Sequence, residues 1–429
     1  MRFYNTLSRK IEEFRPINPP YVGMYTCGPT VYDYQHIGNF RTMMLSDILV
    51  RVLKYNGYEV KSVRNVTDID DKIIAGAAQK NVSISDFSKE FTRVFFEDLE
   101  KLNILPVSVN TYATEYIPKM VSYISELLAK GYAYVEDDGS VYFSIAKFPG
   151  YGKLSKVNLS GLKTGTRILS DEYTKDLVQD FALWKKMGSK ERGGYDSPWG
   201  KGRPGWHIEC SVMSQDNLGD TFDIHVGGRD LKFPHHENEI AQAEVKTGKP
   251  FVNYWVHGEF LNVDGGKMSK SLKNFYTIKD VEEKGFEPLT LRYFYLTAHY
   301  RKLLNFTWEA LEGAQKALDR LREKYAKLAS QELLLRDQFL EAINDDLNMP
   351  QALAVAWKTE SKKDLEEFDK VLGLRLGDLR ELRDMGVPEE IKKLLDEREK
   401  LRGKKKFAEA DEIRDKIIKK GYAVEDNKI

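Results

Sequence analysis

The spacing of apolar residues near the N-terminus predicts one unit of a parallel sheet. Residues 21–29 (YVGMYTCGP) form an apolar, aromatic run that Gly-Pro stops, which indicates a short strand leaving into a turn. From Phe40 to Tyr55 apolar residues recur at helical spacing, and Gly57 follows as a C-terminal cap. Residues 59–66 again indicate a strand. A strand, a turn, a helix and a strand in this order make a βαβ unit.

The rest of the pattern predicts an interrupted α/β domain followed by helices. Residues 75–130 are predicted to be mostly helical, whereas residues 131–200 are rich in turns, glycine and short strands. Strand-like segments return at 221–226 and 254–257, so we interpret the turn-rich stretch as an insertion between two halves of one domain. From about Pro288 the chain is predicted to be almost wholly helical, ending in a charged tail. The predicted fold class is α/β, with a parallel sheet, an inserted connective subdomain and an all-α C-terminal region.

Length, charge and cysteine content narrow the functional classes. The 429 residues suggest about two to four domains. With 66 basic and 66 acidic residues, the zero net charge disfavours a protein that coats nucleic acid or membrane through bulk charge, although a local basic patch stays possible. The two cysteines, Cys27 and Cys210, are too few and too far apart for a disulfide framework, which indicates a reducing compartment. The N-terminus lacks a signal-peptide core and no run of about 18 apolar residues occurs, so we expect a cytoplasmic protein without a membrane partner.

Two common nucleotide-binding motifs are excluded. Residues 200–205 (GKGRPG) fit G-x-G-x-x-G, but no clear strand precedes them and Pro204 stands where a helix must begin, so we expect a turn-rich connector. The sequence has no G-x-x-x-x-G-K-[ST] motif, so it is not a P-loop protein.

A different motif precedes the helix from Phe40. His36-Ile37-Gly38-Asn39 follows the strand and its turn, where the free N–H groups of a helix start suit phosphate. Gly38 permits close backbone approach, and His36 and Asn39 add side-chain donors. Taken alone, these residues are also explained as a helix cap with a satisfied histidine.

A basic loop further along the chain favours phosphate binding over a simple helix cap. Residues 267–271 (KMSKS) follow two glycines, and Lys267 and Lys270 can clamp a polyphosphate transition state. The alternative is a solvated basic loop, which does not explain why both motifs occur together. The pair resembles the HIGH and KMSKS signatures of class I aminoacyl-tRNA synthetases. The resemblance implies ATP-dependent adenylation of an amino acid on a Rossmann-type fold.

Both cysteines belong to a set of residues with the chemistry of zinc ligands. Cys27 ends the first strand, and Cys210 follows a Trp-His-Ile-Glu run. His235 and Glu239 stand at i and i+4 of a predicted helix, so they share one face and can grip one ion. Two thiolates, one imidazole and one carboxylate suit a tetrahedral zinc site. For any one of these residues, a structural role such as packing of a buried cysteine remains the alternative.

The same helix start carries further expectations. In residues 234–240 (PHHENEI), Pro234 suits the first helical position. By the helical spacing rule, His236 and Glu237 are expected to point away from the two candidate ligands on this helix.

The whole pattern closely resembles the cysteinyl-tRNA synthetase family, over nearly the full chain. The matching segments of the catalytic part are 24–33, 64–73, 205–210, 223–225, 233–242, 253–258 and 267–275. Those of the helical part are 292–294, 299–301, 304–306, 346–352 and 407–414.

The resemblance implies the partners and the site residues. It implies ATP with Mg²⁺, L-cysteine and tRNA(Cys) as partners, one Zn²⁺ per chain, and a monomer. Adenylation would draw its donors from His36, Asn39, Lys267 and Lys270. The remaining implied residues are Gly38, Gly227, Gly228 and Asp230 for ATP, Thr67 and Trp206 for the amino acid, and Cys27, Cys210, His235 and Glu239 for zinc.

The resemblance also implies a domain division. The expected parts are a first half of the Rossmann catalytic domain (1–130), a connective insertion (131–200), the second half (201–262), a KMSKS and stem-contact region (263–310), a helical bundle (311–385) and an anticodon-side segment (386–429). Asn39 departs from the signature's second histidine but still donates a hydrogen bond, and Lys273 stands where a glycine is frequent. Short stretches at 355–372 and at the C-terminus leave the anticodon contacts open.

Three other functions remain as alternatives. A ligase that transfers activated cysteine to an amino-sugar, as in mycothiol biosynthesis, would share the zinc and nucleotide motifs, but the helical, basic C-terminal region favours RNA. A non-catalytic, zinc-stabilised RNA-binding protein would not need both nucleotide motifs. A synthetase for another amino acid is excluded if the two thiolates bind zinc at the floor of the pocket.

Overall fold

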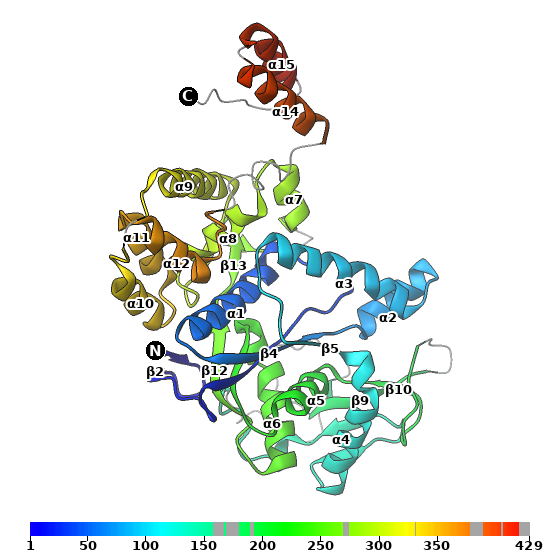
Figure 1. Cartoon of the computed structure of the whole chain (residues 1–429). Helices are drawn as coiled ribbons and strands as arrows, with labels where there is room; N and C mark the ends of the chain where they lie inside the picture. The colour runs from blue at the N-terminus through cyan, green and yellow to red at the C-terminus, as the bar shows by residue number, and fades with distance from the viewer. Residues whose placement is uncertain are drawn as a thin grey trace.

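A five-stranded parallel sheet forms the centre of the protein, in the order β12-β11-β3-β4-β5 (Figure 1). Its strands are β3 (Tyr21–Thr26), β4 (Glu59–Val66), β5 (Val109–Tyr112), β11 (Phe222–Gly228) and β12 (Val252–Gly258). The computed structural model describes residues 1–157, 167–168, 180–188, 193–268, 274–330, 332–377, 389–404 and 406–419. The predicted parallel α/β fold is confirmed, and β5 is a strand that the mostly helical prediction for 75–130 missed.

The sheet has a topological switch point at β3. From β3 the chain crosses through helix α1 (Ile37–Tyr55) to β4 on one side, whereas β11 pairs with the other side of β3. Connections that leave a strand in opposite directions open a crevice at the carboxyl ends of the strands, and open α/β sheets bind their ligands there.

Helices cover both faces of the sheet (Figure 1). Helix α1 packs on one face together with the C-terminal helical region, in a core that includes Phe40, Leu49 and Phe368. The other face packs against α4 and the buried helices α5 and α6, in a core that includes Ile208 and Trp255. The helices up to the end of the sheet are α2 (Asp71–Lys80), α3 (Ile84–Lys101), α4 (Ile117–Ala129), α5 (Trp206–Leu218) and α6 (His235–Thr247).

The predicted insertion at 131–200 contributes three strands to a second sheet, in the order β10-β9-β7-β6, with antiparallel pairing between these strands. The fourth, β10, lies just beyond the predicted boundary. The prediction of a turn-rich connector at 200–205 was wrong in part. Gly202–Pro204 forms β10, because its backbone pairs with β9, and α5 starts two residues later at Trp206. The other strands are β6 (Ala133–Val135), β7 (Val141–Phe143), β8 (Arg167–Ile168) and β9 (Asp180–Lys186).

The described residues of the C-terminal part are helical, as predicted, apart from one strand. Strand β15 (Leu304–Phe306) pairs with β13 (Leu261–Val263), which also pairs with β14 (Gly266–Lys267). The predicted amphipathic helix at 309–328 is α9 (Trp308–Lys327). The others are α7 (Ile278–Glu283), α8 (Pro288–Leu296), α10 (Arg336–Asn344), α11 (Met349–Lys358), α12 (Lys362–Leu372), α14 (Glu389–Gly403) and α15 (Phe407–Lys419). A hairpin that the sequence did not predict, β1 (Arg2–Asn5) with β2 (Lys10–Glu13), precedes the sheet.

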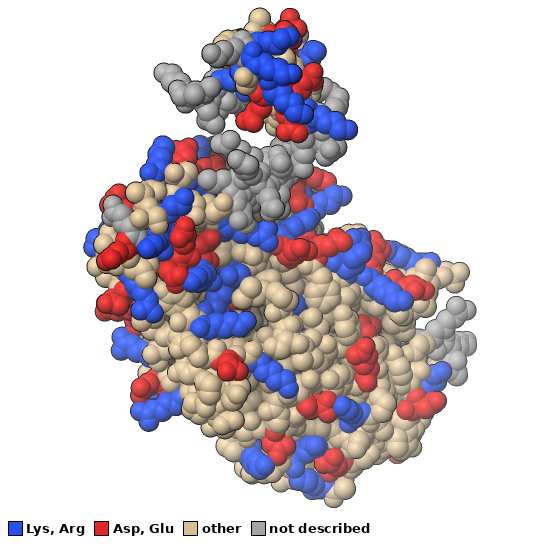
Figure 2. Space-filling view, in the orientation of Figure 1, with Lys and Arg blue, Asp and Glu red and all other residues tan. Residues whose placement is uncertain are grey.

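Surface charge follows the balanced composition. Figure 2 shows basic and acidic side chains interspersed over the visible face. Among the described residues, no helix combines the length and the apolar character that crossing a bilayer requires.

Candidate active site and metal centre

Several predicted site residues directly follow strands that are neighbours in the sheet. Cys27 comes after β3, Thr67 after β4, and Gly227 and Gly228 end β11. Because these three strands are parallel neighbours, the residues meet at one edge of the sheet, at the switch point.

Helix α1 begins at Ile37, three residues earlier than predicted, because His36 is its N-cap. Nδ1 of His36 accepts from the backbone N–H of Asn39 at 3.2 Å, and the side-chain oxygen of Asn39 accepts from the N–H of His36 at 3.1 Å. This reciprocal capping box leaves the NH₂ group of Asn39 as the end that can donate to a phosphate. Burial lowers the pKa of His36 to about 4, so its ring is neutral at pH 7.

The chain that follows the KMSKS segment packs against this helix start. The N–H of Ile37 donates to the carbonyl of Tyr276 at 2.8 Å. The ring of His36 meets Phe275 edge-on, with 5.1 Å between ring centroids. The backbone at 275–277 is therefore fixed to the histidine that the sequence singled out.

The chain that enters KMSKS lies at the same place. Met268 is buried, and a Cβ built on Gly38 would lie 3.7 Å from its Cε atom. Lys267 ends β14. Lys270 and Lys273 fall outside the described residues. The structure thus brings both described sides of the KMSKS segment to the helix start that carries the first motif.

The four predicted zinc ligands are buried together. The donor atoms of Cys27, Cys210, His235 and Glu239 all lie within 4.8 Å of one another. Sγ of Cys27 is 3.9 Å from both Sγ of Cys210 and Oε1 of Glu239, and Nε2 of His235 is 3.0 Å from Oε1 of Glu239. Donors in a tetrahedral zinc site are about 3.3–3.8 Å apart, so this set fits one zinc ion.

Charges in the cluster select which groups ionise. Burial opposes a charged His235, but Glu239 and Cys210 outweigh it and raise its pKa to about 10. Burial also opposes a Cys210 thiolate, yet the hydrogen bond with Cys27 and the charge of His235 lower its pKa to about 6. Burial raises the pKa of Cys27 well above its ordinary value. The proton on His235 therefore stabilises the thiolate of Cys210. A divalent cation would supply the positive charge that a second thiolate, on Cys27, needs in order to form.

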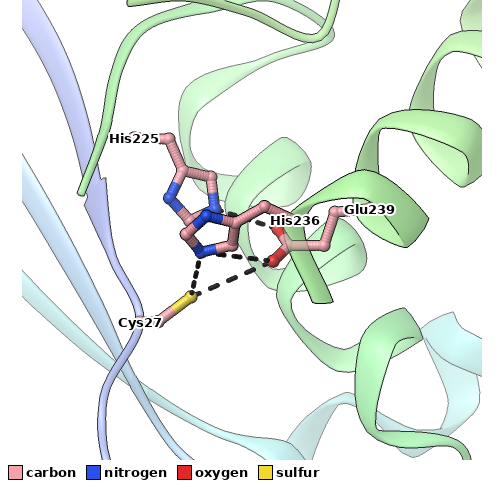
Figure 3. Close-up of side chains that lie close together, drawn as sticks. All are labelled: Cys27, His225, His236 and Glu239. Carbon is pink, nitrogen blue, oxygen red and sulfur yellow. Dashed lines mark hydrogen bonds and ion pairs between the residues drawn. The ribbon is translucent and has the colours of Figure 1, made fainter. Parts of the chain in front are cut away.

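The prediction that His236 points away from this cluster was wrong. Its Nε2 lies 3.4 Å from Sγ of Cys27 (Figure 3), because α6 is buried on more than one face and turns His236 toward the sheet. His225, from β11, reaches Glu239 at 2.9 Å. Glu237 does point away, as predicted, and accepts backbone N–H bonds from Gly152 and Ser155 of the insertion.

Sequence reasoning missed most of the histidines around the cluster. His207 contacts His235 through their Nδ1 atoms at 2.9 Å, and Nδ1 of His236 lies 2.8 Å from Nε2 of His257. The signal was present, since five of the seven histidines fall within residues 207–257. Single histidines carry a strong structural alternative, and only the fold shows that these five converge.

Trp206 and Thr67, predicted for the amino acid pocket, have different positions. The ring of Trp206 packs on His235, with 4.2 Å between centroids, so it borders the metal cluster. Thr67 is buried and its hydroxyl donates to Oε2 of Glu209 at 2.8 Å. Glu209 precedes Cys210 on α5, so Thr67 is tied to the helix that carries a candidate ligand.

The predicted ATP-binding glycines have no room for side chains. A Cβ on Gly227 would lie 2.5 Å from the ring of His236, and one on Gly228 would lie 2.5 Å from Oδ1 of Asp230. The end of β11 therefore passes directly between the metal cluster and Asp230.

Comparison with known families agrees with this arrangement. Residues 13–316 match the family described as tRNA synthetases class I (C) catalytic domain, and residues 384–428 match the cysteinyl-tRNA ligase anticodon binding domain. The chain is 45% identical to the cysteine–tRNA ligase of Chlamydia caviae over 456 residues, which cover 99% of this chain and 96% of the relative. It is 46% identical to that of Chlamydia pneumoniae over 459 residues, with the same coverage.

A similar fold occurs in a solved structure. Methionyl-tRNA synthetase of Mycobacterium tuberculosis, in complex with methionyl-adenylate, matches with a TM-score of 0.58 at 16% identity, covering 82% of this chain and 88% of that one. At this identity the likeness concerns the fold alone. The two domain matches and the full-length relatives show more: the chain belongs to the cysteine–tRNA ligases, a family of class I aminoacyl-tRNA synthetases.

Proposed function

We propose that the protein joins L-cysteine to AMP with release of pyrophosphate, and then transfers the cysteine to the 3′-terminal ribose of tRNA(Cys). The observation that carries the proposal is the buried set of Cys27, Cys210, His235 and Glu239 at the switch point of the sheet, beside the two nucleotide motifs. A cluster rich in sulfur is a recognition element for a thiol-containing amino acid.

Zinc suits this cluster because of its donors. Cys27 and Cys210 supply two sulfurs 3.9 Å apart, which ionise together only beside a cation, and His235 and Glu239 supply nitrogen and oxygen. Bound zinc would supply a soft partner for a substrate thiolate and lower the thiol pKa. Coordination of the substrate thiolate would discriminate cysteine from serine by more than the roughly 1–3 kcal/mol that packing of one methylene-sized group contributes.

The adenylation step needs positioning and charge stabilisation. A carboxylate oxygen of cysteine attacks the α-phosphorus of ATP while the bond to the pyrophosphate oxygen breaks. We assign donors on one side to His36 and Asn39 at the start of α1, and on the other to Lys267 and Lys270, with Mg²⁺ bound to ATP. The neutral ring of His36 can donate a hydrogen bond without carrying charge.

The pocket residues position the substrates. Gly227 and Gly228 would present the bare backbone at the end of β11 to adenosine, and Asp230, which lies against Gly228, would accept from the ribose hydroxyls. Trp206 and Thr67 would line the cysteine pocket, with Trp206 packed on the ligand His235.

Transfer to tRNA involves the helical C-terminal part. The relatives' name and the anticodon-binding match support tRNA as the acceptor. The net charge is zero, so binding has to rest on local basic faces and on shape, and should weaken with salt. The domain division given above, a monomeric state and a cytoplasmic location remain predictions.

Pyrophosphate exchange with cysteine, serine and alanine, with and without a zinc chelator, tests the proposed function. We expect exchange with cysteine alone, and its loss with the metal. Exchange that does not depend on cysteine, or selectivity that survives verified zinc removal, would contradict the proposal. Charging of tRNA(Cys) then separates a synthetase from an amino-sugar ligase.

Gly38→Ala tests the contact between the two motifs. The new Cβ would lie 2.9 Å from the ring of His36 and displace it, so we expect pyrophosphate exchange to fall on the order of 100-fold. Displacing the ring costs stability, but alanine favours a helix by about 1 kcal/mol over glycine. The two effects oppose each other, so thermal stability should change little. Gly313→Ala in α9, where a Cβ meets nothing within 4 Å, is the matched control and should keep full activity. Unchanged exchange in Gly38→Ala would contradict the role of His36.

Lys270→Ala should lower the rate of adenylation about 100-fold, with a much smaller effect on cysteine affinity, because the lysine is assigned to the transition state. Single-turnover formation of the adenylate, measured over a range of cysteine concentrations, separates the two effects. Lys279→Ala, which removes an exposed lysine of α7, is the control. Equal losses in rate and in affinity would argue against a transition-state role.

A further inference from the structure

The carboxylate of Glu239 faces two different histidines. Its Oε1 is 3.0 Å from Nε2 of His235, and its Oε2 is 2.9 Å from Nε2 of His225. All three side chains are buried. One carboxylate therefore connects the predicted zinc ligands to a second group of donors.

Cys27 connects the same two groups. Its Sγ is 3.9 Å from Sγ of Cys210, within the predicted set, and 3.4 Å from Nε2 of His236 outside it. Figure 3 shows His236 and Glu239 directed toward this sulfur, and His225 directed toward the carboxylate of Glu239.

We propose that the metal ion has a second position, bound by Cys27, His225, His236 and Glu239, next to the first. Their donor atoms lie within 4.8 Å of one another, and all four residues are buried. Oε1 of Glu239 is 4.0 Å from Nε2 of His236 and 3.9 Å from Sγ of Cys27. Both distances are close to the spacing of ligand atoms around a tetrahedral zinc ion. Because the two positions share Cys27 and Glu239, one ion occupies them in turn, and the second holds the ion when Cys210 does not bind it. This inference rests on the proposed role of a metal in the cluster.

The ring of His236 is held in place by a hydrogen bond of its second nitrogen, as in metal-binding histidines. Such a histidine donates its other ring N–H to a partner that fixes the tautomer and the orientation of the ring. Nδ1 of His236 is 2.8 Å from Nε2 of His257, whose Nδ1 is 2.8 Å from the hydroxyl of Thr6. Nε2 of His236 is thereby aimed at Cys27. His207 supports His235 in the same way, so the two positions have equivalent surroundings.

His225 is available as the fourth ligand. Its ring stacks on Trp255 with 4.6 Å between centroids, and its Nδ1 has no hydrogen-bond partner in the part of the chain that the structure describes. Within the described residues, the bond to Glu239, itself a ligand, is the one hydrogen bond of this ring, so no other partner opposes its coordination.

Charge balance favours the second position in a buried site. One thiolate and one carboxylate neutralise a divalent ion, whereas the first set, with two thiolates and a carboxylate, leaves one negative charge. A net charge away from water is costly. The neutral set is therefore suited to retaining the ion.

Cobalt(II) titration of two reciprocal double variants of the full chain tests the proposal. In a Cys210→Ala background, His235→Gln leaves the second set intact, and His236→Gln removes a ligand from it. We expect Cys210→Ala and Cys210→Ala/His235→Gln to bind one equivalent with affinities within about tenfold of each other, with single-thiolate charge-transfer absorption. Cys210→Ala/His236→Gln should bind at least about 100-fold more weakly. The opposite order, or no binding by Cys210→Ala, would overturn the second position.

Two further measurements keep the outcome interpretable. Circular dichroism of each metal-free variant reports folding, and Cys210→Ala/His257→Gln, which removes only the support of His236, should bind 10- to 100-fold more weakly than Cys210→Ala if the core is intact. Equal binding by that variant would contradict the proposal. If the wild type shows cysteine-dependent pyrophosphate exchange but Cys210→Ala/His235→Gln binds no metal, the second metal position is contradicted and the proposed function is not. If the double variants bind cobalt in the expected order but the wild type shows no pyrophosphate exchange, only the proposed function is contradicted.

Discussion

Cys27→Ser is expected to abolish cysteine-dependent pyrophosphate exchange, lowering kcat/KM by at least about 10⁴-fold, or about 5.5 kcal/mol. Cys27 belongs to both candidate sets of metal ligands, so no alternative set of four remains among the described residues when its sulfur is lost. A serine hydroxyl does not ionise near neutral pH and is a hard donor, so it does not replace a thiolate. Zinc content after purification and exchange kinetics with cysteine measure the two parts of the effect.

The control for Cys27→Ser is a change on β3, the strand that Cys27 follows, which leaves the Cys27 thiol in place. Met24→Leu alters a buried side chain of β3 with nearly constant volume, and should cost less than about 1.5 kcal/mol of stability and keep full zinc. Full zinc content and unchanged selectivity in Cys27→Ser would remove the basis for recognition by metal.

Local rules predicted the parts of the site that lie close together in sequence. His235 and Glu239 were expected to share a helical face, and their side chains are 3.0 Å apart. The strand before Cys27 and the strands near 222 and 254 were also expected, because apolar runs ended by glycine and proline mark buried strands. The order in which these strands pair, and therefore the meeting of Cys27 with α5 and α6, depends on long-range packing that spacing alone does not contain.

His236 shows where a local rule fails. The spacing rule places neighbouring residues on different helical faces, and it assumes that one face is the functional one. Helix α6 is buried on several faces, so His235 meets Trp206 while His236 meets the sheet. The room for His236 comes from Gly227 on β11, where any Cβ would strike the ring at 2.5 Å.

The start of α1 shows a second kind of limit. The spacing of apolar residues placed the helix start at Phe40, and histidine is not among the residues preferred as N-caps. In the fold His36 caps the helix with its ring nitrogen and Asn39 completes the box. His36 is therefore the cap and Ile37 to Asn39 form the first turn, which agrees with the helix cap that was left open as an alternative, whereas a role in binding phosphate stays a prediction.

Asp47→Ala should destabilise the protein by about 3–5 kcal/mol, because it removes one partner of a fully buried ion pair. Oδ2 of Asp47, on α1, accepts from Arg292 at 2.6 Å and from Arg51 at 2.8 Å, and its Oδ1 accepts from the N–H of Leu105. Without the carboxylate, two buried guanidinium groups lose their hydrogen bonds to Asp47 and repel each other, and the hydrogen bonds that they keep among the described residues go to backbone carbonyls. Urea denaturation of the two proteins measures the loss.

The same network joins the sheet to the helical region. Arg292, on α8, also donates to the carbonyls of Leu102, Asn103 and Leu372, which follow α3 and end α12. Burial lowers the pKa of Arg292 and Asp47 opposes that shift, so the pair stabilises the charged form. Asp47→Ala/Arg292→Met removes the ion pair and fills the space with an apolar side chain, so it should be less destabilised than Asp47→Ala alone. Additive losses in the double variant would mean that the carbonyl contacts of Arg292, rather than its pairing with Asp47, hold α1 against α8 and α12.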